Sequence, residues 1–236
     1  MTRHFDQELA ELKEKLLTMA SHAETAVTRA LQALVNRDDD LARTVKNDDT
    51  VIDRMEIEID EMAINILTKA PLATELRLIT VAMKISHDLE RVGDEATTIA
   101  RRSIELSQEP QLKPYVDLPR MAALAMEMLR DALDAFVNGN SAKAEAVIPR
   151  DKEVDNLNKQ LHRELASYMV ENPNTISRAL NLMVISKSLE RIADHATNIA
   201  EEVVYLHEAR DIRHTGKGSG PGSQPEAGPS PTPPTP

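Results

Sequence analysis

The sequence contains one sixteen-residue segment twice. Residues 85–100 read ISHDLERVGDEATTIA and residues 185–200 read ISKSLERIADHATNIA, so that ten of the sixteen positions are identical. The offset of 100 residues (185 − 85) is far longer than the unit of a solenoid, which indicates that each copy belongs to a small folding unit of its own. A chain of 236 residues is long enough for two such units.

The composition and the spacing of apolar residues predict that both units are helical. Aromatic residues make up 2% of the chain and tryptophan is absent, so the core must consist of aliphatic side chains, which suit helices. Apolar residues recur every three or four positions in six stretches, at about 5–34, 41–66, 74–107, 121–137, 141–170 and 175–208. We therefore predict an all-α fold of two tandem three-helix bundles related by the internal repeat. Pro149 should kink the fifth helix, because proline lacks the amide hydrogen that a helix interior requires.

The distribution of proline and glycine predicts the domain boundaries. The first three-helix repeat covers residues 1–109, a linker with three prolines covers residues 110–119, and the second repeat covers residues 120–210. Residues 211–236 change abruptly to glycine, serine and proline. Such a composition cannot bury enough apolar surface to offset the entropy of ordering, so we expect a disordered tail.

The charge and the absent motifs exclude several classes of function. A formal net charge of −11 argues against a nucleic-acid partner, which normally requires a basic surface. The chain has no cysteine, hence no disulfide or thiolate metal site, and it shows no secretory segment and no apolar run of membrane-spanning length. It also lacks a glycine-rich phosphate loop, Gly-x-Ser-x-Gly and His-Glu-x-x-His. We expect a cytoplasmic protein that is not an enzyme.

Each copy of the repeated segment carries an acidic pair, Glu90 with Asp94 and Glu190 with Asp194. Residues four apart share one face of a helix, and paired carboxylates are ligands for hard and borderline cations. A second matched pair occurs upstream in each repeat at an offset of 102 residues (151 − 49), which places one acidic pair on the second helix and one on the third. The eight candidate metal ligands are Asp49, Asp53, Glu90 and Asp94 in the first repeat and Asp151, Asp155, Glu190 and Asp194 in the second.

Two observations keep a purely structural interpretation open. With 39 acidic residues in the chain, chance alone produces about six acidic pairs at this spacing. Arg91 and Arg191 directly follow the two glutamates, so ion pairing is an alternative to metal binding. His87 and His195 lie in different registers of the two copies and are not predicted as ligands.

The doubled Leu-Glu-Arg-x-x-Asp pattern resembles a known family. The segments KISHDLERVGDEA (84–96) and SLERIADHA (188–196) are similar to the two signature helices of the PhoU family of phosphate-transport regulators. The resemblance spans residues 5–207 and implies two three-helix bundles, often in a homodimer. It also implies multinuclear metal clusters on the eight acidic residues named above. Iron or zinc is the expected metal, with magnesium and manganese as alternatives.

The resemblance further implies a regulatory function in phosphate homeostasis. Proteins of this family restrain phosphate uptake by the high-affinity ABC transporter and repress phosphate-starvation signalling through a sensor histidine kinase. The implied partners are the ATPase subunit of that transporter and the membrane kinase, so that the membrane is contacted only through them. Two alternatives remain: a carboxylate-bridged metalloenzyme or metal store of helical-bundle type, and a helical scaffold without metal.

Overall fold

The computed structural model describes residues 2–69, 72–210 and 212, with side chains from residue 5 onwards. Within these residues the chain forms seven α-helices and two short 3₁₀ helices and no strand, which confirms the all-α prediction. The elements are α1 (Thr2–Asn36), α2 (Asp39–Leu67), α3 (Ala73–Ser107), α4 (Asp117–Asn138), α5 (Ser141–Val147), η1 (Ile148–Arg150), α6 (Asp151–Glu171), η2 (Pro173–Thr175) and α7 (Ile176–Glu208). The predicted tail, 211–236, lies outside the described residues apart from Ile212.

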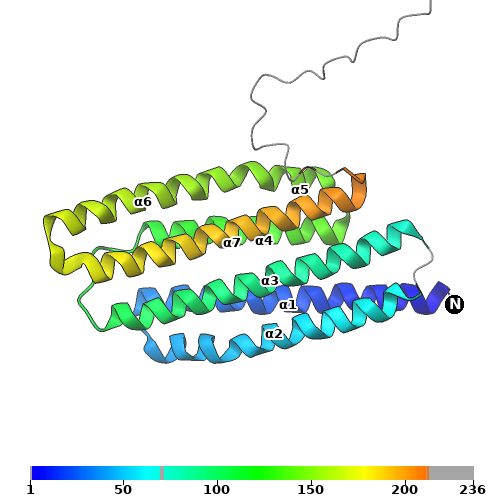
Figure 1. The fold of residues 1–236 in the computed structure, drawn as a ribbon, viewed down its shortest axis with the longest axis horizontal. Coiled ribbons are helices and arrows are strands. Elements are labelled where there is room, and N and C mark those ends of the chain that lie inside the picture. Colours follow the sequence, from blue (N-terminus) through cyan, green and yellow to red (C-terminus); the bar gives the residue numbers. More distant parts are fainter. Residues whose placement is uncertain (1, 70–71, 211, 213–236) are drawn as a thin grey trace, which may run out of the picture.

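The helices form two three-helix bundles that lie lengthwise beside each other (Figure 1). One bundle contains α1, α2 and α3, and the other contains α4, the pair α5 and α6, and α7. The apolar seams predicted from the sequence are the buried faces of the helices. One residue from each helix of the first bundle serves as an example, and all three are fully buried: Leu16, Ile59 and Ile85. Burying an aliphatic side chain of this size contributes about 1.5–3 kcal/mol, so these seams hold the bundles together.

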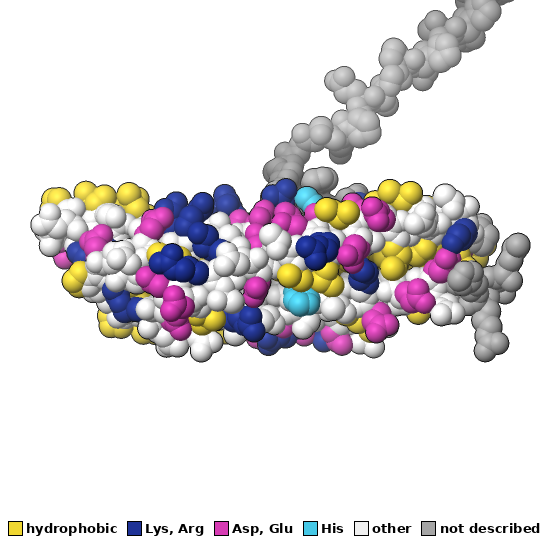
Figure 2. Space-filling view, turned by 90° about the horizontal axis from the view of Figure 1, so that it is seen from below, with side chains coloured by type: hydrophobic (Ala, Val, Ile, Leu, Met, Phe, Trp, Pro, Cys, Tyr) yellow, Lys and Arg dark blue, Asp and Glu magenta, His cyan; other side chains and the backbone are white. Residues whose placement is uncertain are grey.

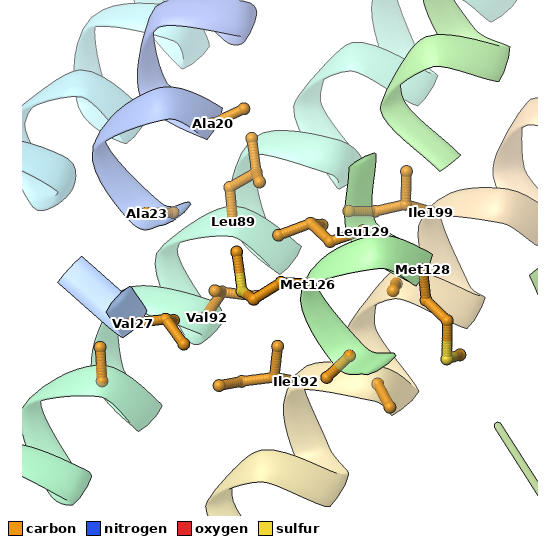
Figure 3. Packing of buried hydrophobic residues seen from close by; sticks show 14 of the residues in the cluster. Ala20, Ala23, Val27, Leu89, Val92, Met126, Met128, Leu129, Ile192 and Ile199 are labelled. Atoms are coloured by element: carbon orange, nitrogen blue, oxygen red, sulfur yellow. The ribbon is translucent and has the colours of Figure 1, made fainter. Parts of the chain in front are cut away.

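The two bundles share one continuous apolar core. Leu89 and Val92 of α3, Met126 of α4 and Ile192 of α7 point toward one another where the bundles meet (Figure 3). All four side chains are buried. The repeats are therefore packed against each other through their signature helices.

The signature helices α3 and α7 run antiparallel along this contact. Lys84 Nζ lies 3.0 Å from both carboxylate oxygens of Glu202 at one end. Arg102 Nη1 donates to Asn181 Oδ1 over 3.4 Å at the other end. The partner's number falls as the residue number on α3 rises, which is the pattern of an antiparallel pair. An internal duplication packed in this way places the two repeats about an approximate two-fold axis.

The same turn joins the first two helices of each repeat. Arg37 and Gly139 are equivalent (139 − 37 = 102), and both adopt a left-handed backbone, with φ of 56° and 63°. The next residues, Asp38 and Asn140, each accept a hydrogen bond from the backbone amide three residues later. Such side-chain caps satisfy one of the unpaired amides at a helix start.

Prolines modify the second repeat in two places. The predicted fifth helix is interrupted at η1, which contains Pro149, so that α5 ends at Val147 and α6 begins at Asp151. The following helix start places Asp151 in the first turn of α6, where a carboxylate is favourably oriented. α4 begins at Asp117, inside the stretch predicted as a linker, with Pro119 in its first turn, where proline is tolerated.

Within the part of the chain that the structure describes, no helix combines the length and apolar character that crossing a bilayer requires.

Candidate carboxylate sites

In the first repeat, the acidic pairs of α2 and α3 face each other. A Cβ atom placed on Gly93 would lie 3.4 Å from Asp49 Oδ1, and His87 Nδ1 lies 3.1 Å from Glu56 Oε1. The residue number rises along α2 as it falls along α3, so these helices are antiparallel neighbours. This is the arrangement in which two acidic pairs can converge.

Electrostatic coupling follows from this proximity. Burial raises the pKa of Asp49, and the charges of Asp53 and Asp94 raise it further. Burial also raises the pKa of Glu90, with the charge of Asp94 adding to the effect. The four predicted residues of the first repeat therefore form one electrostatically coupled group, which we call carboxylate site 1.

Arg91 partly neutralises carboxylate site 1. Its Nη1 lies 3.1 Å from Asp94 Oδ2, and its Nε lies 3.3 Å from Glu90 Oε2. The ion pairing anticipated from the Glu-Arg dipeptide is thus present in this repeat. The Arg91 side chain is 49% exposed, so solvent screens its ion pairs and they contribute little to stability. A metal cation could therefore displace Arg91 from the carboxylates at a small cost in free energy.

The equivalent group in the second repeat, carboxylate site 2, is more strongly coupled. Burial raises the pKa of Asp151 to about 6, and the charges of Asp194, Asp155 and Glu190 contribute, in that order. Partial desolvation by the surrounding protein raises the pKa of Asp194 as well, although its side chain reaches solvent. The charge of Glu190 adds to that shift. All four predicted residues of the second repeat are brought together.

Two lysines contact carboxylate site 2, but they leave Asp151 Oδ1 without a partner in the described part of the chain. Lys187 forms an ion pair with Glu190, and Lys159 Nζ lies 3.2 Å from Asp155 Oδ2. Asp151 Oδ1 is buried without a hydrogen-bond partner among the described residues. A buried carboxylate oxygen without a partner is unfavourable, and a bound cation would satisfy it.

Both sites have the ligand chemistry that hard or borderline metal ions prefer. Each offers four carboxylates. Burial first, and the charges of neighbouring acids second, raise the pKa values of Asp49 and Asp151, and a bound cation would offset that repulsion. Their ligand atoms are loosely arranged, however. Among the described residues, the group of three that brings its ligand atoms within 4.8 Å of one another is Glu56, His87 and Glu90.

Sequence reasoning missed Glu56 and His87. Glu56 lies seven residues after Asp49 and so shares its face of α2, and His87 precedes Glu90 by three residues on α3. Both signals were present in the sequence. Neither residue is matched in the second repeat, which carries Asn158 and Lys187 at these positions (56 + 102 and 87 + 100).

The surface on the α2 side carries mixed charges. Acidic and basic side chains are interspersed along this face and form no continuous field of one sign (Figure 2). The carboxylate sites are therefore local groups, and the net charge of −11 is not concentrated into one acidic surface on this side.

Comparisons with known proteins cover both repeats. The family model described as "PhoU domain" matches residues 16–103 and 118–203. The phosphate-specific transport system accessory protein PhoU homolog of Pseudomonas aeruginosa is 42% identical over 218 residues, which are 92% of this chain and 90% of that protein. The crystal structure of PhoU from Pseudomonas aeruginosa superimposes with a TM-score of 0.84 at 42% identity and covers 87% of this chain and 100% of that one. That of the phosphate transport system regulatory protein PhoU from Streptococcus pneumoniae gives a TM-score of 0.83 at 30% identity, with 88% and 99% covered. The chain belongs to the PhoU family.

Proposed function

We propose that this protein is a regulatory accessory protein of phosphate-specific transport. The observation that carries the proposal is the extent of the family match, which includes both repeats and both signature helices. The relatives are named as an accessory protein of the phosphate-specific transport system and as a phosphate transport system regulatory protein. The function is regulatory and not catalytic, in keeping with the lack of catalytic motifs in the sequence.

The regulation acts through protein partners. The protein restrains phosphate uptake by contacting the ATPase subunit of the high-affinity ABC transporter, and it represses phosphate-starvation signalling through a membrane sensor histidine kinase. It does so in the cytoplasm as a homodimer. The long, two-bundle shape offers extended helical faces for such contacts (Figure 1).

The two carboxylate sites hold metal ions in this proposal. Asp49, Asp53, Glu90 and Asp94 are the ligands in the first repeat. In the second repeat the ligands are Asp151, Asp155, Glu190 and Asp194. Iron or zinc is the expected metal, with magnesium or manganese as alternatives. The metal would supply positive charge that holds the facing carboxylates of adjacent helices together, and the protein residues supply the oxygens and their spacing.

A deletion strain tests the regulatory function. Starvation-induced genes should become active in phosphate-rich medium when the gene is deleted and fall silent again on complementation. The transporter ATPase should be recovered in a pull-down from phosphate-rich cells. Starvation genes that stay silent in the deletion strain would contradict the proposal.

Metal analysis tests the carboxylate sites separately. We expect the purified protein to contain bound metal and the double variant Asp94→Ala/Asp194→Ala to contain much less. If both preparations are equally poor in metal and equally active in regulation, the metal sites are refuted and the regulatory function stands. Uptake of many iron atoms per chain would instead favour a metal store.

A further inference from the structure

Glu56, His87 and Glu90 form a compact group with mixed ligand chemistry. His87 Nδ1 lies 3.1 Å from Glu56 Oε1, across the contact between α2 and α3. One ligand atom from each of the three side chains lies within 4.8 Å of the other two. The group differs from the carboxylate sites because it contains an imidazole nitrogen.

The surroundings leave this group accessible and partly unsatisfied. The His87 side chain is 58% exposed, whereas those of Glu56 and Glu90 are 25% and 16% exposed. Glu90 Oε2 is buried and accepts no hydrogen bond, although Arg91 Nε lies 3.3 Å away. An open groove of about 520 Å³, lined by Glu56 and His87 among others, adjoins the group and gives solvent access.

The second repeat shows what the same positions look like when they are closed. Lys187, the counterpart of His87, forms an ion pair with Glu190. Asn158, the counterpart of Glu56, is buried and accepts a hydrogen bond from Ser186. At this position the second repeat therefore carries an ammonium group that pairs with its glutamate, whereas the first repeat carries an imidazole, which can bind a metal ion.

We propose that Glu56, His87 and Glu90 bind one divalent transition-metal ion of the zinc class. The ligands are one imidazole nitrogen and two carboxylate oxygens, and water from the groove completes the coordination, as in open zinc sites with three protein ligands. Imidazole favours zinc, nickel and copper, whereas magnesium prefers oxygen ligands only, so the site selects against magnesium.

The geometry requires only side-chain movement. Two ligands of a tetrahedral zinc ion lie about 3.4 Å apart, given metal–ligand distances of about 2.1 Å. The Glu56–His87 pair is already at 3.1 Å. Glu90 reaches the ion by rotating its side chain, since its ligand atom is within 4.8 Å of the others. The site shares Glu90 with carboxylate site 1 but does not depend on metal binding there.

Zinc titration of the full-length, chelator-treated protein tests the proposal. In protein labelled with ¹⁵N-histidine, one of the seven histidines should shift at the first equivalent of Zn²⁺, and that signal should be missing in His87→Gln. We expect His87→Gln to weaken Zn²⁺ binding by about tenfold or more and to leave Mg²⁺ binding unchanged, because the substitution is neutral and removes only the nitrogen ligand. His22 is also an exposed histidine but lies on α1, outside the proposed site. His22→Gln is therefore the matched control and should behave like the unmodified protein.

Further variants separate this site from carboxylate site 1. Asp49→Asn/Asp53→Asn should retain the His87 shift, while Glu56→Gln should lose it. An unshifted His87 signal, or Zn²⁺ affinity unchanged in His87→Gln, overturns the proposal and leaves an ion pair only. Equal losses of Zn²⁺ and Mg²⁺ in His87→Gln also overturn it, because selectivity is then absent. Circular dichroism and the urea midpoint confirm that each variant is folded.

Discussion

His195 Nδ1 of α7 lies 2.8 Å from Asp88 Oδ1 of α3, and this contact joins the two repeats. Asn198 Nδ2 donates to the same oxygen over 3.2 Å. The side chains of Asp88 and His195 are 13% and 19% exposed, so the contact is largely shielded from water.

Replacement of Asp88 by alanine should destabilise the protein. It leaves the His195 side chain, which is largely buried, without its acceptor, and an unpaired polar group of this kind costs about 1–3 kcal/mol. The matched control is Glu153→Ala, which breaks the ion pair with Arg120 between side chains that are 51% and 61% exposed. We expect the control to change the free energy of unfolding by less than about 0.5 kcal/mol. Urea unfolding measures both, and equal effects would contradict this account of the repeat contact.

The pKa of Asp151 predicts a pH dependence of stability in the metal-free protein. Burial and neighbouring acids raise this pKa from its ordinary value of 3.8 to about 6. The folded state therefore binds the proton more tightly than the unfolded state, and the free energy of unfolding falls as the pH rises from about 4 to about 6.

Asp151→Asn should remove that dependence. With chelator present at pH 7.5, we expect the variant to be more stable than the unmodified protein by about 1–2 kcal/mol, less than the full shift implies because solvent reaches the site. The difference should disappear at pH 4. Asp48→Asn, at an acid whose side chain is 56% exposed, is the control and should keep the pH dependence of the unmodified protein, because Asp151 is intact. Parallel stability curves for Asp151→Asn and the unmodified protein would refute the assignment.

Gly93 and its counterpart Ala193 predict unequal effects of the two reciprocal substitutions. A Cβ at Gly93 would lie 2.9 Å from Ile52 Cδ1, the flexible end of a side chain. Gly93→Ala should change stability by less than about 1 kcal/mol, since the gain in helix propensity offsets the crowding. Ala193→Gly should lose about 1 kcal/mol, because Ala193 is fully buried within α7. Thermal unfolding tests both. A large loss in Gly93→Ala would mean that Ile52 cannot move aside.

Arg37 should stabilise the end of α3 despite its left-handed backbone. Its Nη2 donates to the carbonyl oxygens of Leu106, Ser107 and Glu109 over 3.2, 2.7 and 2.6 Å. Arg37→Gly relieves a backbone strain of about 1 kcal/mol, yet it removes bonds of about 1.5–3 kcal/mol to a charged donor. We expect a net loss of about 1–2 kcal/mol in urea unfolding.

Arg37→Lys is the companion variant, because lysine keeps the charge but cannot match the reach of the guanidinium. The free energy of unfolding of Arg37→Lys should lie between those of Arg37→Gly and the unmodified protein. It should lie below both if the backbone strain at position 37 outweighs the hydrogen bonds that lysine retains. A gain in stability for Arg37→Gly would show that the carbonyl contacts contribute nothing.

The bundles were predictable because their signal is local. Leu16 and Ile59 belong to seams whose spacing of three and four residues needs no knowledge of the partner helix. The eight carboxylates were predictable because the duplication preserved them at matched positions. Whether they bind metal stays a prediction.

His87 and the burial of Asp151 were not predictable for physical reasons. A search for features common to both repeats discards a residue that only one repeat carries, and His87 is such a residue. The surroundings of Asp151 depend on where α6 begins after the interruption at η1, and that boundary follows from tertiary packing. Ion pairing of Lys187 likewise depends on a side-chain rotamer that the sequence does not encode.

The covalent link between the two repeats has a consequence for how such a protein can change over time. In a homodimer of single repeats, every mutation appears at both sites at once. In this chain each repeat mutates alone, so that Lys187 can pair with the glutamate of one repeat while His87 occupies the equivalent position in the other. One ancestral unit can in this way acquire two chemically distinct sites without losing the antiparallel contact that holds the repeats together.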